Sequence, residues 1–209
     1  RCDMKEITSY NRAVQYMSKV FKMVNEEYFG NELEMPTITI QSTVGAYGHV
    51  TTSKVWKTDT GNASYELNIG ADYLNRPIEN IVATLIHEGC HLYAMQNGIK
   101  DTSNRGCYHN RRFKALAESR GLIISQHPVY GWTLTQPSEK TLEFCEKYGL
   151  KEVLINRGAV HWTDEEPDTP VVKKGKSIRW ICPKCAAIIR STKNVNAICG
   201  DCNLPFIKS

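Results

Sequence analysis

No apolar run in this 209-residue sequence approaches the roughly 18 residues that span a bilayer, and no secretory signal peptide is recognisable. The sequence also lacks the cysteine pattern of a secreted disulfide framework. Four of its eight cysteines form two C-x-x-C pairs, and the other four are scattered. Thiols with this spacing are typical of a reducing compartment, so we expect a cytoplasmic protein with no membrane partner.

Acidic residues are nearly missing from the last part of the chain. Between residues 171 and 209, eight lysines and arginines face a single acidic residue, Asp201, which gives a net charge of +7. Residues 1–170 hold 18 basic and 21 acidic residues and carry a net charge of −3. A basic segment favours a polyanionic partner such as DNA. A merely solvated face would have the same charge, so both interpretations stay open.

The length predicts one good-sized domain with a small appendage. An apolar fraction of 41% and a charged fraction of 23% describe an ordinary globular protein. The polar, acidic run over residues 163–170 contains two prolines, as a linker does. We therefore expect a main domain over residues 1–162, a linker over 163–176 and a small domain over 177–209.

Hydrophobic periodicity predicts an α+β main domain, in which helices pack on a small, mainly antiparallel sheet. No chemistry is assigned to residues 122–162 at this point. The expected helices cover residues 8–29, a stretch ending near 96, 109–120 and 137–148, and the expected strands cover 37–41, 47–55, 64–69 and 122–125.

The apolar stretch from Ile81 to Ala94 carries His87, Glu88 and His91 in the order H-E-x-x-H. Positions i and i+4 lie on one face of a helix, so the two imidazoles can bind one metal ion from a rigid element. Glu88, on the adjacent flank, can act on a water molecule without being a ligand. This is the arrangement of zinc peptidases, with two ligands and a general base.

Such a string also arises by chance in about one random chain in 40 of this length, and its histidines can simply be hydrogen-bonded. Helix-start signals at Asn75 and Pro77 and a stop at Asn97-Gly98 favour the metal site. His109, at the head of the next predicted helix, is the expected third ligand. Cys107 is a less suitable rival, because a thiolate would quench the acidity of the metal. The remaining histidines are interpreted as surface or hydrogen-bonded residues: His49, His127 and His161.

Two C-x-x-C pairs near the end of the chain are separated by thirteen residues: Cys182 and Cys185, then Cys199 and Cys202. This spacing predicts a four-cysteine structural zinc site in a zinc ribbon. A segment of some 30 residues cannot bury enough core to fold unaided, so the metal would stabilise it. Trp180 could stack on an unpaired base or pack into the ribbon, and both alternatives remain.

The chain resembles the SprT-like family of zinc metallopeptidases. The resemblance runs from the helix end at Asn25–Phe29 and the strand after Pro36 to the stretch from Ala83 to His91, then to His109 and the aromatic Phe113, and the ribbon is similar to that of bacterial and phage members. It implies a zincin-like core, a catalytic zinc ion and, by analogy with eukaryotic relatives, proteolysis of proteins crosslinked to DNA. The family usually has glycine after the third histidine, where this sequence has Asn110.

Together these patterns predict a zinc endopeptidase with one catalytic and one structural zinc ion, acting on protein substrates that are associated with DNA. Candidates for stabilising the oxyanion are Tyr108, Tyr47 and His49. Two alternatives remain: a nucleic-acid-binding protein whose zincin scaffold has no peptidase activity, and a narrow processing protease that does not use nucleic acid.

Overall fold

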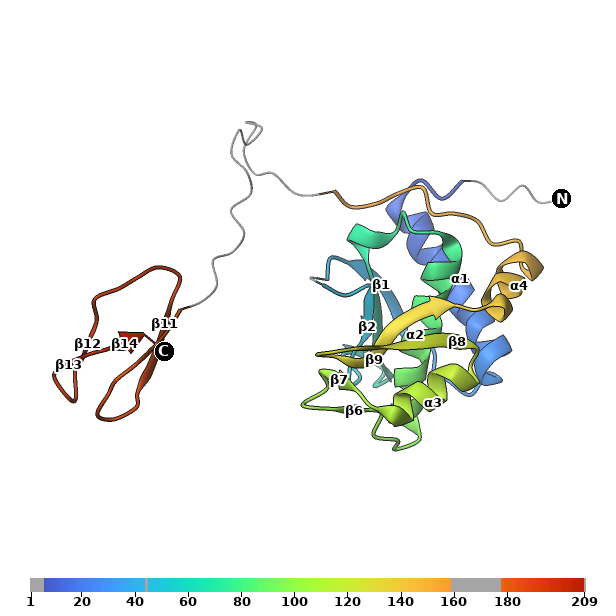
Figure 1. Ribbon diagram of the computed structural model, residues 1–209. Helices are drawn as coiled ribbons and strands as arrows, with labels where there is room; N and C mark the ends of the chain where they lie inside the picture. Colours follow the sequence, from blue (N-terminus) through green and yellow to red (C-terminus); the bar gives the residue numbers. More distant parts are fainter. Residues whose placement is uncertain (1–5, 44, 159–177, 209) are drawn as a thin grey trace. The chain divides into compact units, whose positions relative to one another are not determined.

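The computed structural model describes residues 6–43, 45–158 and 178–208. The chain forms two compact units, residues 1–159 and 160–209 (Figure 1). The linker predicted over residues 163–176 lies outside the described residues. Among the residues that are described, no helix is both long enough and apolar enough to cross a membrane.

The first unit contains four α-helices, and each predicted helix end lies within two residues of an observed one. The first helix starts at Tyr10 because Ser9 has an extended backbone, and it stops at Gly30, whose φ of 62° suits glycine. Its inner face buries Met17 and Phe21 completely. The helices are α1 (Tyr10–Phe29), α2 (Ile78–Gln96), α3 (Arg111–Ser119) and α4 (Glu139–Lys147), with a short 3-10 helix, η1 (Ala71–Tyr73).

Helix α2 lies in the middle of this unit and packs against α1, α3, α4 and strands β2 and β9 (Figure 1). Its backbone turns from extended to helical after Pro77, and the helix ends at Asn97 before Gly98, which has a φ of 64°. Apolar side chains such as Ile81, Leu85 and Leu92 are fully buried. A helix that is packed on several sides presents its remaining side chains from a rigid element.

The first sheet of the unit has the strand order β1-β5-β2, with β1 parallel to β5 and β2 antiparallel to it. This sheet is therefore mixed, whereas the sequence predicts a mainly antiparallel one, because β5 lies between β1 and β2 and runs parallel to β1. Residues 58–62 join two short strands, β3 and β4, that form a separate hairpin. The strands are β1 (Thr37–Gln41), β2 (Gly48–Val50), β3 (Trp56–Lys57), β4 (Ala63–Ser64) and β5 (Glu66–Gly70).

A second sheet of the same unit has the order β6-β7-β9-β8. It contains the predicted strand after residue 122 and a partner strand, β9, that the sequence analysis did not predict. Residues 150–156 return to the first part of the chain: Val153 bridges Ile7, and the Tyr16 hydroxyl of α1 accepts a hydrogen bond from the Lys151 backbone. The strands are β6 (Thr102–Ser103), β7 (Tyr108–His109), β8 (Leu122–His127) and β9 (Gly131–Pro137).

The second unit is made of short strands and turns, as a zinc ribbon is. Strand β10 lies between β11 and β14, and β12 pairs with β13. Within residues 178–208, the buried side chains are those of Cys182 and Cys199. The strands are β10 (Ile178–Ile181), β11 (Ile188–Ser191), β12 (Ile198–Cys199), β13 (Leu204–Pro205) and β14 (Ile207–Lys208).

Candidate metal centre

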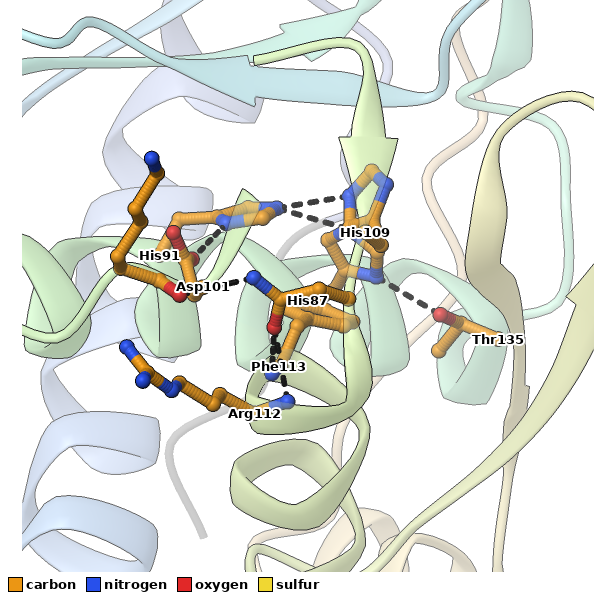
Figure 2. Close-up of polar contacts among 9 residues, drawn as sticks. His87, His91, Asp101, His109, Arg112, Phe113 and Thr135 are labelled. Atoms are coloured by element: carbon orange, nitrogen blue, oxygen red, sulfur yellow. Dashed lines mark hydrogen bonds and ion pairs between the residues drawn. The ribbon is translucent and has the colours of Figure 1, made fainter. Parts of the chain in front are cut away.

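Three imidazole rings converge on one point beside α2 (Figure 2). His87 and His91 come from successive turns of α2, and their Nε2 atoms lie 3.2 Å apart. The Nε2 atom of His109 lies 3.2 Å from that of His87 and 3.0 Å from that of His91. The structure therefore brings together the three histidines that the sequence singles out.

His109 reaches this point from a strand, and the prediction that it begins the next helix is wrong. It is the last residue of β7, and Asn110 is the N-cap of α3. The Asn110 side chain accepts hydrogen bonds from the backbone N–H groups of Arg112 and Phe113 and donates one to the Lys100 carbonyl at 2.8 Å. Its backbone is extended, with a φ of −90°, so the position does not need glycine.

The separations between the three Nε2 atoms suit a zinc ion. Tetrahedral zinc with Zn–N bonds of about 2.0–2.1 Å places its nitrogen ligands about 3.3 Å apart. The observed distances of 3.0–3.2 Å are close to this value. The donor set therefore fits a tetrahedral metal site with three protein ligands.

Hydrogen bonds on the far side of two rings favour the tautomers whose Nε2 atoms carry lone pairs. The Thr135 hydroxyl lies 3.2 Å from the Thr133 carbonyl and 2.7 Å from His87 Nδ1, so by donating to this carbonyl it can accept from the ring. His91 Nδ1 donates to the Asp101 carboxylate at 2.5 Å. Two lone pairs that face each other at 3.2 Å repel unless a cation lies between them, which favours a metal ion at this point.

The Nδ1 atom of His109 is buried, and it has no hydrogen-bond partner of good geometry among the described residues. The Tyr130 carbonyl is near enough to raise the pKa of this imidazole. That contribution is smaller than the effect of burial, which together with the nearby His91 lowers the pKa of His109 to about 4. Burial, followed by the two neighbouring imidazoles, also lowers the pKa of His87 well below its ordinary value. Neutral imidazole is the form that binds metal.

The fully buried ring of Phe113 lies beneath the three histidines (Figure 2). Its centroid is 4.6 Å from the rings of His87 and His91 and 4.7 Å from that of His109. It belongs to the first turn of α3, whose N-cap follows His109 directly. One side chain thus supports all three candidate ligands.

Gly131, the first residue of β9, makes room for the backbone of His109. The two residues pair in parallel register, and His109 N–H donates to the Tyr130 carbonyl at 2.9 Å. A Cβ atom on Gly131 would lie 2.2 Å from the His109 carbonyl oxygen, and its φ is 73°. The position therefore needs glycine for two independent reasons.

Glu88 is 5% exposed and lies on the flank of α2 that faces β2. A Cβ atom added to Gly48 of that strand would be 3.5 Å from Glu88 Cγ. Burial raises the pKa of Glu88 to about 7, while His91 and a hydrogen bond from the Val50 backbone lower it in part. The carboxylate is thus held between the histidine helix and an edge strand.

Several other residues considered from the sequence lie apart from this cluster. Cys107 is exposed in the turn between β6 and β7, and His49 is exposed in β2. His127 accepts hydrogen bonds from the backbone of Val129 and Tyr130. His161 lies outside the described residues.

Four cysteines of the second unit form the other candidate metal group, with all their Sγ atoms within 4.8 Å of one another: Cys182, Cys185, Cys199 and Cys202. The Sγ atoms of Cys185 and Cys199 are 3.7 Å apart. Tetrahedral zinc with Zn–S bonds of about 2.3 Å places its sulfur ligands about 3.8 Å apart. The group therefore fits a tetrahedral ion bound by four thiolates.

The two halves of this cysteine site have the same local backbone. The residue after each C-x-x-C pair has a positive φ, 58° at Ala186 and 52° at Asn203. Each of these residues donates its N–H to the carbonyl of the first cysteine of its pair, at 3.0 Å and 2.8 Å. Trp180 is half-buried and donates to the Ser191 hydroxyl at 2.8 Å, which supports the packed alternative.

Asp101, Thr135 and Gly131 were not predicted from the sequence, and the role of residues 122–162 was left open. Asp101 follows His91 by ten residues and Thr135 follows His87 by 48, so no short motif contains these pairs. Their signals in the sequence are weaker than a short motif. Asp101 is a lone acidic residue, and Gly131 is an isolated glycine in an apolar, alternating stretch.

Comparisons with curated proteins and with solved structures gave no match. The sequence model described as the SprT-like family matches residues 17–129, which is more than half of the chain. The matched range contains His87, Glu88, His91, Asp101 and His109, and it ends before Thr135 and the four cysteines. The chain belongs to the SprT-like family.

Proposed function

We propose that this protein is a zinc-dependent endopeptidase with a zincin-like core and a structural zinc ribbon. The observation that carries the proposal is the buried carboxylate of Glu88 beside three imidazoles whose Nε2 atoms lie 3.0–3.2 Å apart. A scaffold without catalysis has no need to bury an acidic side chain at this point, because burial of a carboxylate costs free energy.

His87, His91 and His109 would hold the catalytic zinc ion. When bound, zinc polarises a substrate carbonyl and makes water more acidic. Asp101 and Thr135 fix the ring orientation and tautomer of His91 and His87. Glu88 takes a proton from the attacking water and passes it to the amine of the leaving peptide.

Strand β2 provides a place for an extended peptide. Among the described residues it pairs only with β5, and its other edge is free beside α2. An added peptide strand would form main-chain hydrogen bonds with Gly48–Val50 and pass over Glu88. This placement favours cleavage within a chain that is locally unfolded.

The variant Glu88→Gln tests the proposal. It removes the proton acceptor but keeps the size of the side chain, so we expect a loss of about 10²–10⁴-fold in the cleavage of an unfolded protein, with two zinc ions retained. Glu79→Gln, on the first turn of the same helix, is the matched control and should keep its activity. A zinc-loaded wild type that cleaves no protein, or a Glu88→Gln variant of equal activity, would refute the proposal.

The proposal extends to substrates that are bound to DNA. The +7 charge of residues 171–209 supports it, as does the cross-strand register of Arg179 and Arg190, two like charges that lie side by side on the ribbon. Cleavage and gel mobility should change when single- or double-stranded DNA is added at low salt. No change in either measurement would remove DNA from the proposal and favour a narrow processing protease.

A further inference from the structure

A second charged group, Arg76, contacts α2 one helical turn before Glu88 and has no role in the proposed chemistry. Arg76, just before α2, donates from Nη2 to the Thr84 hydroxyl at 3.1 Å. Thr84 lies on α2 one turn before Glu88. A Cβ atom added to Gly48 would be 3.0 Å from Thr84 Cγ2 and 3.5 Å from Glu88 Cγ, so both side chains lie against one residue of β2. The guanidinium is therefore bonded to a residue that lies one helical turn from the proposed catalytic Glu88.

Two tyrosines hold the guanidinium in place. Arg76 Cζ is 4.0 Å from the centroid of the Tyr47 ring, and Nε donates to the Tyr73 carbonyl at 3.0 Å. The two aromatic rings meet edge to face at 4.9 Å. Tyr47 is 54% exposed and immediately precedes β2, so this group opens to solvent at the start of the free edge strand.

Among the residues that the structure describes, the guanidinium has no counter-ion. Arg76 is half-buried, and burial lowers its pKa from the ordinary value. Among the described residues no carboxylate forms an ion pair with it, and only two of its five N–H groups have hydrogen-bond partners. A partly desolvated cation without an anion is costly, and the planar end of the guanidinium matches a carboxylate with two parallel hydrogen bonds.

We propose that Arg76, flanked by Tyr47 and Tyr73, forms a substrate subsite for a carboxylate and gives the protease a preference for acidic peptides. The inference rests on the proposed peptidase function. A peptide added antiparallel to β2 runs from Val50 toward Gly48, so the carboxylate belongs to a residue on the C-terminal side of the cleaved bond. An acidic side chain and a free C-terminal carboxylate share this chemistry.

The first experiment measures binding without turnover. Fluorescein-labelled peptides from one cleaved sequence, with Glu or Gln at each position after the cleaved bond, are titrated into zinc-loaded Glu88→Gln protein and followed by anisotropy. We expect one Glu position to improve Kd by about tenfold, in line with one charge-assisted pair. The further change Arg76→Gln should abolish this difference. Peptides with free or amidated C-termini distinguish the two sources of the carboxylate.

The second experiment measures cleavage. An unfolded protein is digested with wild type and with the variants Arg76→Gln, Arg76→Lys and Arg76→Glu, and the cleaved bonds are identified by mass spectrometry. With wild type, acidic residues should be enriched on the C-terminal side of the cleaved bond. The enrichment should be smaller with Arg76→Lys. With Arg76→Glu, Lys and Arg should be enriched there instead. Zinc content and melting temperature of each variant show whether the fold is kept.

A structural role for Arg76 predicts a different result. If Arg76 only connects Tyr73 and Thr84 through hydrogen bonds, its loss weakens the binding of the Glu and Gln peptides equally. That outcome overturns the inference. If an oligonucleotide displaced the Glu peptide as well as an unlabelled Glu peptide does, Arg76 would be assigned to phosphate binding instead. Cleavage without any acidic preference refutes the subsite alone, whereas the absence of both cleavage and peptide binding refutes the proposed function with it.

Discussion

Replacing Gly131 by alanine tests whether β9 sets the position of the third histidine. The new Cβ atom would lie 2.2 Å from the His109 carbonyl oxygen, so the two strands must separate by about 1 Å or more to reach an ordinary contact distance. Metal sites tolerate ligand displacements of only about 0.2 Å. We expect Gly131→Ala to move His109 out of range of its partners.

The substitution has two costs that can be separated. Alanine at a φ of 73° costs about 1–2 kcal/mol in any context. The clash adds about 1–3 kcal/mol, the usual cost of overpacking. Gly98→Ala is the matched control, because Gly98 has a φ of 64° and an added Cβ atom would meet no atom within 4 Å.

The assay is zinc content after equilibration with a weak chelator, together with urea unfolding of the same samples. Wild type and Gly98→Ala should hold two zinc ions per chain, whereas Gly131→Ala should hold about one, bound to the four cysteines. Its free energy of unfolding should lie below that of Gly98→Ala by the cost of the clash. If Gly131→Ala kept both ions and matched Gly98→Ala in stability, the proposed constraint on His109 would be wrong.

Three further predictions concern the surroundings of the two sites. Asp101→Asn should weaken the catalytic site about 10–100-fold in chelator competition, because the amide is a poorer partner for His91 Nδ1; unchanged affinity would contradict this. Asn110→Ala should lower the free energy of unfolding by about 1 kcal/mol in urea, since it removes the N-cap of α3, while Asn110→Asp keeps the acceptor and most of the stability. Serine at both Cys182 and Cys199 should remove one zinc ion and leave the melting of the first unit unchanged; a lower melting temperature would show that the two units are coupled.

The parts of the site that the sequence predicted are those with short, fixed spacing. His87 and His91 are one helical turn apart, so the helix alone determines their relation. The same holds for each C-x-x-C pair. The structure places His109 beside the other two histidines, but the prediction that it lies on a helix is wrong, because Asn110 caps α3 and the preceding strand ends at His109.

The remaining site residues depend on strand pairing, which the sequence pattern leaves undetermined. Thr135 reaches His87 only because β9 lies between β7 and β8 in the sheet. In the first sheet, β5 lies between β1 and β2 and runs parallel to β1. The residues of β5 carry no local signal for this insertion. Arg76 also gives no signal in the sequence, because its significance comes from Thr84 and Tyr47 together.

The two candidate metal groups differ in what holds their ligands in place. The histidines stand on a core that includes the fully buried Phe113 and Leu85, and hydrogen bonds orient two of the rings independently of a metal. Within residues 178–208 the buried side chains are the ligands Cys182 and Cys199 themselves, so no apolar core supports that unit. We therefore expect removal of metal to unfold the second unit and leave the first unit folded, because the second unit would depend on metal–thiolate bonds for its stability.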